Sequence, residues 1–227
     1  MAYNVITLPA WKEFRDQVLA IHSTRGYVWR GQRKDETQNW LLQSKFDRCV
    51  PSKDDRERTS KLKRHLENFK KEMHKSYPNL LPRNDVDIWA LGQHYGLRTP
   101  LLDWTLSPFI AAYFAFQTEK GASDPNDDYR YVYALNRSIE RLISKMKSGN
   151  KVLAREASVP FIDKVPHANP RLSAQMGILT QALKGKDLAK YVGSFSRLKP
   201  SEVMLMKFCI PTEDREECLH ESPFDEY

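Results

Sequence analysis

Residues 97–118 read LRTPLLDWTLSPFIAAYFAFQT, and this stretch decides the fold. Residues 97–105 contain three leucines and a tryptophan around a single acid, Asp103, and predict a buried strand. Ser107 and Pro108 predict a helix start, because a capping hydroxyl precedes a proline at the first helical position. The run from Pro108 to Thr118 is nearly all apolar, so we expect a helix buried in the core.

Helices and strands are mixed on both sides of this stretch. Apolar residues at helical spacing predict helices over residues 9–22, 59–77, 85–96 and 138–147. Gly96 is suited to close the third of these in a left-handed cap. Short β-rich runs predict strands at residues 27–29 (broken by Gly31), 130–135, 159–162, 177–181 and 203–210, and residues 50–58 read as a charged loop. Because the elements do not alternate regularly, the fold class is predicted to be α+β.

Length and composition predict one globular domain. The 227 residues are 41% hydrophobic, which excludes a disordered chain, and 29% charged, which argues against a membrane-embedded one. The start, MAYNVITLPAWKEF, lacks a basic stretch followed by an apolar run, so we expect no secretion signal and a cytoplasmic protein. We expect residues 1–227 to form a single domain with its core at about 9–212 and an acidic tail at 213–227.

The cysteines and histidines do not predict a metal site. Cys49, Cys209 and Cys218 are unevenly spaced, with no C-x-x-C pair, and the six histidines show no metal-ligand spacing. The sequence also lacks a Walker loop, a G-x-G-x-x-G fingerprint and an H-E-x-x-H motif.

Three segments carry more information than their composition. Residues 27–32, YVWRGQ, present Arg30 and then Gly31, whose missing side chain would leave the backbone open to a ligand. Residues 89–115 read WALGQHYGLRTPLLDWTLSPFIAAYFA, and residues 169–177 read NPRLSAQMG. Together these segments resemble the FRG domain, a bacterial and phage family named for a Phe-Arg-Gly signature whose aromatic is Trp29 here. The resemblance runs from about residue 9 to 212.

The FRG pattern in turn resembles the Arg-Ser-Glu class of ADP-ribosyltransferases, which use NAD as co-substrate. This implies an ADP-ribosyltransferase-like α+β fold, with a mixed, mostly antiparallel sheet flanked by helices. Arg30-Gly31 matches the first core strand of that class, and residues 103–107 match the turn before its apolar helix. The late glutamate of the class has no direct counterpart, so Gln175 or Glu202 would take its place.

The resemblance implies a set of site residues. The candidate catalytic residues are Arg30, His94, Asp103, Gln175 and Glu202, and the candidate NAD-binding residues are Arg30, Gly31, Gln32, Tyr95, Thr99, Thr105, Ser107 and Tyr113. A guanidinium can hold phosphate or ribose oxygens with paired donors, and aromatic rings can stack on nicotinamide. Structural alternatives stay open: Asp103 could be a buried ion-pair partner of Arg30 or Arg98, His94 could cap helix carbonyls, and Thr105 and Ser107 could be helix caps.

The charge distribution suggests a polyanionic partner. The net charge is +7, but residues 213–227 contribute a net −6, so residues 1–212 carry +13. The predicted helix 59–77 has a basic face, and its candidate nucleic-acid contacts are Lys61, Lys63, Arg64, Lys70 and Lys71. That face could equally be only solvated, and the acidic tail could shield the basic surface or dock a partner.

These observations lead to one main interpretation and two alternatives. The main one is an NAD-dependent ADP-ribosyltransferase that needs no metal and acts as a toxin or anti-phage effector on nucleic acid, with RNA favoured. The resemblance to stand-alone FRG proteins also implies an antitoxin protein as partner. The first alternative is a metal-independent ribonuclease that uses Arg30, His94 and Asp103 for acid–base work and phosphate binding. The second is a non-catalytic module that binds nucleic acid or a partner through the basic helix.

Overall fold

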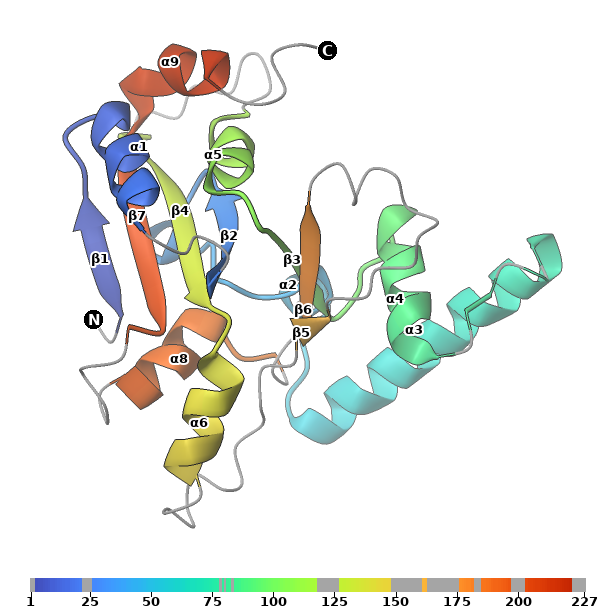
Figure 1. Cartoon of the computed structure of the whole chain (residues 1–227). Coiled ribbons are helices and arrows are strands. Elements are labelled where there is room, and N and C mark those ends of the chain that lie inside the picture. Colours follow the sequence, from blue (N-terminus) through green and yellow to red (C-terminus); the bar gives the residue numbers. More distant parts are fainter. Residues whose placement is uncertain are drawn as a thin grey trace.

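The structure is a computed structural model, and it describes residues 3–21, 26–77, 79, 81–82, 84–117, 127–147, 161–162, 176–181, 185–196 and 203–221. Its centre is a seven-stranded sheet in the order β1-β7-β4-β2-β3-β6-β5 (Figure 1). The strands are β1 (Asn4–Thr7), β2 (Tyr27–Gln32), β3 (Leu101–Thr105), β4 (Tyr129–Asn136), β5 (Phe161–Ile162), β6 (Gly177–Gln181) and β7 (Leu205–Pro211). β1 runs parallel to β7 and the other neighbours pair antiparallel, which confirms the α+β class and the mixed, mostly antiparallel sheet.

Helices cover both faces of the sheet, and further helices lie to one side of it (Figure 1). They are α1 (Trp11–Ala20), α2 (Lys45–Cys49), α3 (Asp55–Ser76), α4 (Asp85–His94), α5 (Pro108–Phe116), α6 (Ile139–Lys147), α8 (Leu188–Ser196) and α9 (Arg215–His220), with short 3-10 turns η2 (Glu36–Gln38) and η4 (Thr212–Asp214). The core helix predicted from Pro108 is therefore present, and Ser107 caps it by accepting from the Ile110 N–H at 3.3 Å. Gly96 follows α4 with φ +83°, as the predicted left-handed cap requires.

The alternation of side chains along β4 divides the core into two layers. Val132 and Ala134 belong to the cluster that joins the sheet to α1, α5 and α9, whereas Tyr133 and Leu135 belong to the cluster under α6 and α8. Successive strand residues point to opposite faces, so one strand supplies both layers. A third cluster packs α3 and α4 against β3 and β6, with Leu66 and Trp89 at its centre.

Several element boundaries differ from the sequence expectation, and for two of them the structure shows the physical cause. The strand β2 does not break at Gly31: it continues to Gln32, because Gly31 and Gln32 pair with Val132 and Tyr131 of β4. The helix α3 begins at Asp55 rather than at Thr59, since the Asp54 carboxylate accepts from two main-chain N–H groups at 2.8 Å and so caps the helix earlier.

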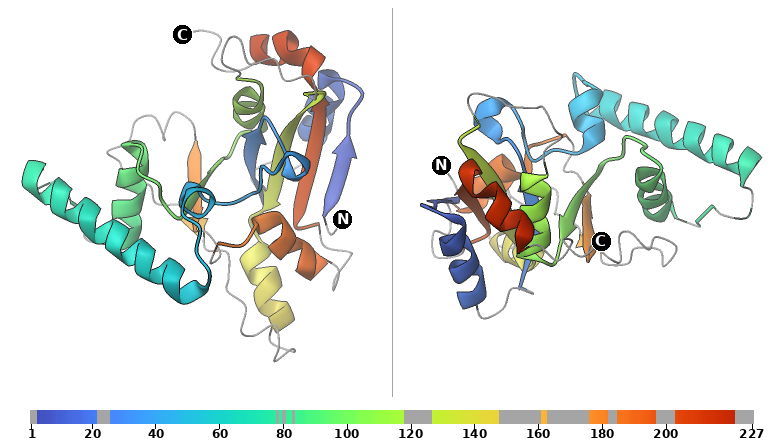
Figure 2. Two further views of the ribbon diagram at one scale, coloured as in Figure 1. Left: turned by 180° about the vertical axis from the view of Figure 1, so that it is seen from behind. Right: turned by 90° about the horizontal axis from the view of Figure 1, so that it is seen from above.

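Helix α3 projects to one side of the sheet (both views of Figure 2). Its first turns are anchored by the buried Arg58 guanidinium, which contacts both oxygens of Asp47 in α2 at 2.5 and 3.0 Å. Leu66 then packs onto α4, and beyond it the helix continues with an exposed outer face.

The described part of the acid-rich C-terminal segment is packed onto the fold. The main-chain N–H of Trp11 donates to Asp214 at 2.6 Å, and its indole N–H donates to Glu221 at 2.8 Å. Cys218 of α9 is buried against α1 and α5. These acids therefore hold the two ends of the chain together, while residues 222–227 lie outside the described residues.

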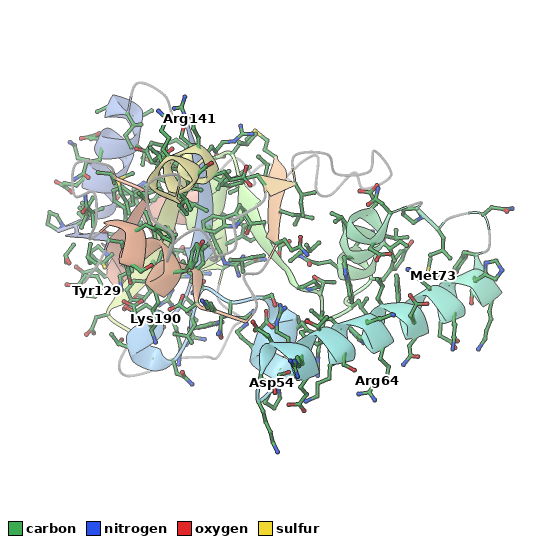
Figure 3. All side chains as sticks on the ribbon, turned by 90° about the horizontal axis from the view of Figure 1, so that it is seen from below. Asp54, Arg64, Met73, Tyr129, Arg141 and Lys190 are labelled. Atoms are coloured by element: carbon green, nitrogen blue, oxygen red, sulfur yellow. The ribbon has the colours of Figure 1, made fainter. Side chains whose placement is uncertain are left out.

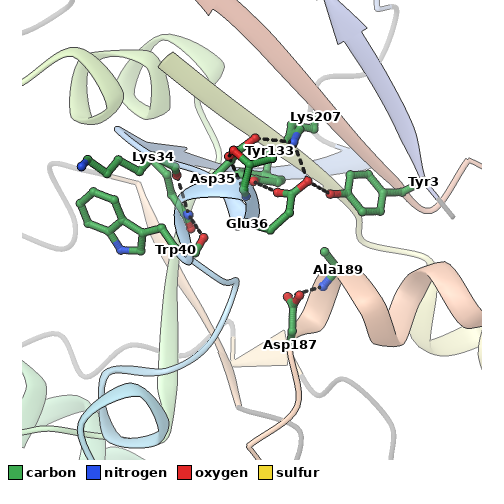
Figure 4. Close-up of polar contacts among 11 residues, drawn as sticks. Tyr3, Lys34, Asp35, Glu36, Trp40, Tyr133, Asp187, Ala189 and Lys207 are labelled. Atoms are coloured by element: carbon green, nitrogen blue, oxygen red, sulfur yellow. Dashed lines mark hydrogen bonds and ion pairs between the residues drawn. The ribbon is translucent and has the colours of Figure 1, made fainter. Parts of the chain in front are cut away.

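A buried ionic network ties β7, η2 and the N-terminal segment (Figure 4). The Lys207 ammonium, 3% exposed, lies 2.8 Å from the Asp35 carboxylate and 2.7 Å from that of Glu36. The hydroxyls of Tyr3 and Tyr133 donate to Glu36 at 2.8 and 3.2 Å. Burial raises the pKa of the Asp35 and Glu36 carboxyls, but the hydrogen bonds that they accept and the charge of Lys207 together outweigh it, so both pKa values lie below their ordinary ones.

Candidate functional site

The sheet opens between β2 and β3. The two strands pair at Trp29 and Thr105, whereas β2 pairs with β4 over six positions and β3 pairs with β6 over five. Past Trp29 the strands separate, and a cavity of about 370 Å³ lies between them. It is lined by residues of β2, α4, β3, α5 and β6; the polar side chains are Arg30, Gln93, His94, Asp103 and Thr105, and the apolar and glycine residues are Trp29, Gly31, Ala90, Trp104, Ala111, Phe114, Gly177 and Leu179.

The half-buried guanidinium of Arg30 lies on the β2 side of this cavity. Its Nη1 donates to the main-chain oxygen of Asp103 at 2.7 Å, and its Nε donates to Gln32 at 3.3 Å. Burial lowers the pKa of Arg30, and the nearby charge of Asp103 acts in the opposite direction. Among the described residues, two of its five N–H donors are thus engaged, which leaves three for a ligand.

Asp103 corrects an expectation from the sequence. It occupies the exposed position in the middle of β3, between buried neighbours, so its carboxylate is not a buried charge. That carboxylate accepts a hydrogen bond from the Gln93 amide at 2.5 Å, whereas Arg30 bonds the main-chain oxygen of Asp103. The alternative of a buried Arg30–Asp103 or Arg98–Asp103 ion pair is therefore wrong. Within the described lining of the cavity, Asp103 is the single acid.

His94 stands at the C-terminal end of α4, where the helix meets the cavity. Its exposed ring contacts the ring of Tyr95 edge to face, with ring centres 5.2 Å apart. Tyr95 itself is 67% exposed and lies outside the cavity lining. On the opposite wall, Phe114 of α5 lines the cavity and packs edge to face on Tyr113.

Gly31 lines the cavity, but its missing side chain also has a packing cause. A Cβ atom built at Gly31 would lie 1.8 Å from the main-chain oxygen of Ala111 and 2.7 Å from the nitrogen of Ala115. Helix α5 therefore rests directly on the backbone of β2. The two adjacent residues have different roles: Arg30 faces the cavity, and Gly31 allows α5 to pack directly against β2.

The other candidate NAD-binding residues hold local structure. Gln32 is buried and donates to the main-chain oxygens of Lys34 and Trp40, which fixes the loop after β2. The Thr105 hydroxyl lines the cavity and accepts from the Ser107 N–H at 3.1 Å, while Ser107 caps α5. Thr99 is 1% exposed and donates to the side-chain oxygen of Gln93.

Two candidate catalytic residues, Gln175 and Glu202, lie outside the described residues. The described residues resume at Met176. Its main-chain oxygen accepts a hydrogen bond from the Leu106 N–H, and the next residue, Gly177, lines the cavity. The roles of Gln175 and Glu202 therefore stay predictions.

Sequence reasoning assigned no role to Gln93. Its amide is the hydrogen-bond partner of Asp103, and it lies on the cavity wall one residue before His94. The signal was present in the Gln-His pair in the last turn of a helix that leads into the Asp103 strand. A single amide in a helix, however, has no spacing that identifies its partner.

The basic face of α3 is divided between paired and unpaired charges. Lys61 lies 2.8 Å from Glu57, and Lys70 contacts Glu67 and Asp85 at 3.3 and 2.8 Å. By contrast Lys63, Arg64 and Lys71 are exposed, with no ion pair among the described residues. Arg64 points away from α4, on the outer side of the projecting helix (Figure 3).

The described residues contain neither a candidate metal cluster nor a membrane-spanning helix. No cluster of three or more histidine, cysteine, aspartate or glutamate side chains there could hold a metal ion. Nor does any described helix combine the length and apolar character needed to cross a membrane.

Comparison with known proteins matches one family. The family model of the FRG domain matches residues 25–124, a range that contains β2, α4, β3 and α5 and thus most of the cavity wall. Neither a curated protein nor a solved structure matches the chain. The FRG domain model thus matches one continuous part of this chain, and the cavity at the opening of the sheet lies largely within the matched residues.

Proposed function

We propose that this cavity is the active site of an NAD-dependent ADP-ribosyltransferase. The observation that carries the proposal is the meeting of Arg30, His94 and Asp103, which come from three separate segments, on the wall of one cavity. Cavities that collect a few convergent polar groups among aromatic side chains are the usual form of a small-molecule site, with volumes of about 300–1,000 Å³. At about 370 Å³ this one would hold one half of a dinucleotide, with the other half across its rim.

The polar residues match the charges of the substrate. The dinucleotide carries two phosphates, and the free donors of Arg30 can bind phosphate or ribose oxygens with charge-assisted hydrogen bonds. When the bond between ribose and nicotinamide breaks, the electron pair leaves with nicotinamide and positive charge develops on the ribose. The Asp103 carboxylate is the negative group that the cavity offers to that charge. His94, which lines the cavity, would accept the proton that the acceptor hydroxyl or amine loses as it attacks.

Nucleic acid, with RNA favoured, is the proposed acceptor. Residues 1–212 carry a net +13, and the outer side of α3 exposes Lys63, Arg64 and Lys71. Such unpaired cations on a projecting helix suit the phosphate backbone of a polyanion. A role as toxin or anti-phage effector and an antitoxin partner remain parts of this proposal.

The direct test is transfer of label from NAD. The protein would be incubated with NAD labelled in its adenylate phosphate, together with RNA, DNA or no added acceptor, and nicotinamide release would be measured in parallel. We expect label on RNA, with losses of about 100-fold or more in Arg30→Gln and Asp103→Asn, as for the removal of other charge-stabilising groups. The exposed Arg141→Gln serves as control. Absence of both label transfer and nicotinamide release with every acceptor overturns the proposal.

A metal-independent ribonuclease is the second candidate, and one observation favours it. His94 is exposed on the cavity wall together with an arginine and a carboxylate, and these are the groups that acid–base cleavage of RNA requires. RNA cleavage that persists in EDTA and does not respond to NAD would select this function. Binding of RNA without either chemistry would select the non-catalytic module.

A further inference from the structure

A directed chain of hydrogen bonds ends on the carboxylate of Asp103. Thr99 is 1% exposed, and its hydroxyl accepts from the Leu101 N–H at 3.3 Å and donates to the side-chain oxygen of Gln93. With its oxygen bound to Thr99, the amide of Gln93 can present only its NH₂ group to Asp103. That group donates to Asp103 Oδ1 at 2.5 Å.

The chain fixes the carboxylate without neutralising it. A carboxylate has about four lone-pair sites, and the described partners of Asp103 occupy one of them. The donor is a neutral amide, whereas a lysine or arginine at the same place would offset the negative charge. Arg30 makes its hydrogen bond to the main-chain oxygen of Asp103, not to the carboxylate, and so fixes the strand. The carboxylate is thereby held in one orientation with its charge available to the cavity.

We propose that Gln93, oriented by Thr99, is a positioning residue that holds the Asp103 carboxylate for the reaction in the cavity. The inference rests on the proposed transferase function and deepens it. It also gives Thr99 a role different from contact with NAD, since the Thr99 side chain lies behind Gln93 and outside the cavity lining. A merely structural relay would brace α4 against β3 and would leave the chemistry of folded enzyme unchanged.

Matched substitutions at Thr99 separate the two roles. Thr99→Val keeps the shape of the side chain and removes the hydroxyl, whereas Thr99→Ser keeps the hydroxyl. Nicotinamide release from NAD would be measured as kcat and KM, with the folded fraction taken from thermal melts. We expect Thr99→Ser to stay within about twofold of the parent and Thr99→Val to lose about tenfold or more in kcat, with KM changed by less than about threefold, because a misplaced group costs rate rather than binding.

A double-mutant cycle provides a second measurement that does not depend on how Thr99→Val folds. Gln93→Leu removes the donor to Asp103, and Asp103→Asn removes the charge that it holds. If Gln93 acts through Asp103, the double variant is about as slow as Asp103→Asn alone, because the two losses are not additive. Independent roles would multiply the two losses.

The outcomes are distinguishable from failure of the proposed function. An active parent with equal kcat for Thr99→Ser and Thr99→Val, or with multiplicative losses in the cycle, overturns the positioning role and leaves the transferase standing. A parent that releases no nicotinamide overturns the transferase and the positioning role together.

Discussion

Gly31 contributes both to the packing of the fold and to the wall of the cavity. The residue stands between Arg30, which faces the cavity, and the buried Gln32, and helix α5 lies directly on its backbone. Position 31 must be a glycine because β2 and α5 lie too close together to leave room for a side chain. The position of Arg30 relative to α5 depends on it.

Gly31→Ala is expected to destabilise the protein by about 3 kcal/mol or more, because the new methyl would overlap main-chain atoms that cannot rotate away. Gly96→Ala is the matched control: its Cβ would meet nothing within 4 Å, and the cost comes only from φ +83°, about 1–2 kcal/mol. Urea unfolding of both variants measures the difference. A smaller loss for Gly31→Ala than for Gly96→Ala would contradict the close packing of α5 on β2.

At the scale of elements, α3 leaves much of its surface exposed. Its inner side packs on α4 through Leu66, and its first turns are held by the Arg58–Asp47 pair. Its outer side carries Lys63, Arg64 and Lys71, which no carboxylate among the described residues neutralises. This helix is therefore the element on which an electrostatic partner should depend.

The double substitution Lys63→Gln/Arg64→Gln should weaken RNA binding and lower the slope of log K against log salt by about 1.4–1.8, since each phosphate contact contributes about 0.7–0.9. Arg141→Gln/Lys190→Gln removes one arginine and one lysine, both exposed, from the far side of the molecule (Figure 3). This control should change the slope by much less. Equal changes in both pairs would mean that net charge, and not α3, governs binding.

At the scale of the whole molecule, the Lys207 network joins segments from both ends of the chain. Tyr3, η2, β4 and β7 meet in it, and Tyr133 is the cross-strand neighbour of Arg30. Because the pKa values of Asp35 and Glu36 are lowered in the folded protein, these groups stabilise the fold fully at pH values above their ordinary pKa values of 3.8 and 4.5. This stabilisation is lost as the pH falls through their folded pKa values. Burial lowers the pKa of Lys207, but the hydrogen bonds to both acids and their negative charges together outweigh it, so the pKa is raised above 10.5. The contribution of Lys207 is therefore complete below that pH and is lost only as the pH rises through the folded value.

Lys207→Met should therefore be most harmful near neutral pH. It leaves the buried Asp35 and the half-buried Glu36 carboxylates without their cation, and loss of the partner of a buried charge typically costs about 3–5 kcal/mol. The deficit relative to the parent should shrink as the pH falls toward 4, because the carboxyls become protonated and no longer need the ammonium. Unfolding curves between pH 4 and 7 measure this, with the exposed Lys190→Met as control. A deficit that is the same at both ends of the range would contradict the network.

Elements with a strong local cause could be predicted from the sequence, and those that depend on distant partners could not. Ser107-Pro108 starts α5 as predicted, Gly96 ends α4, and β6 has the predicted bounds Gly177–Gln181. The strand Asn4–Thr7 was missed because it is short and owes its place to parallel pairing with β7, some 200 residues later. Helix α8, with Gly193 and two serines, was missed because those residues have low helix propensity and burial against the sheet stabilises it.

The site was predictable as a set of residues but not as a geometry. Arg30, His94 and Asp103 were chosen from the sequence, and all three line the cavity. That cavity exists because β2 and β3 separate after a single paired position. How two strands some 70 residues apart pair cannot be read from the sequence of either strand. For the same reason the sequence left an ion pair at the Asp103 side chain open as an alternative, where the structure has the Gln93 amide.

Calorimetric titration with NAD tests the central claim most directly. We predict that NAD binds the parent protein and that Arg30→Gln weakens binding by about 10-fold or more, the effect of losing charge-assisted hydrogen bonds worth about 1.5–3 kcal/mol. The melting temperature of Arg30→Gln should stay within a few degrees of the parent, because its guanidinium bonds one main-chain oxygen at the cavity wall and supports no buried charge. No binding of NAD to the parent, or equal binding to parent and Arg30→Gln, would contradict the account.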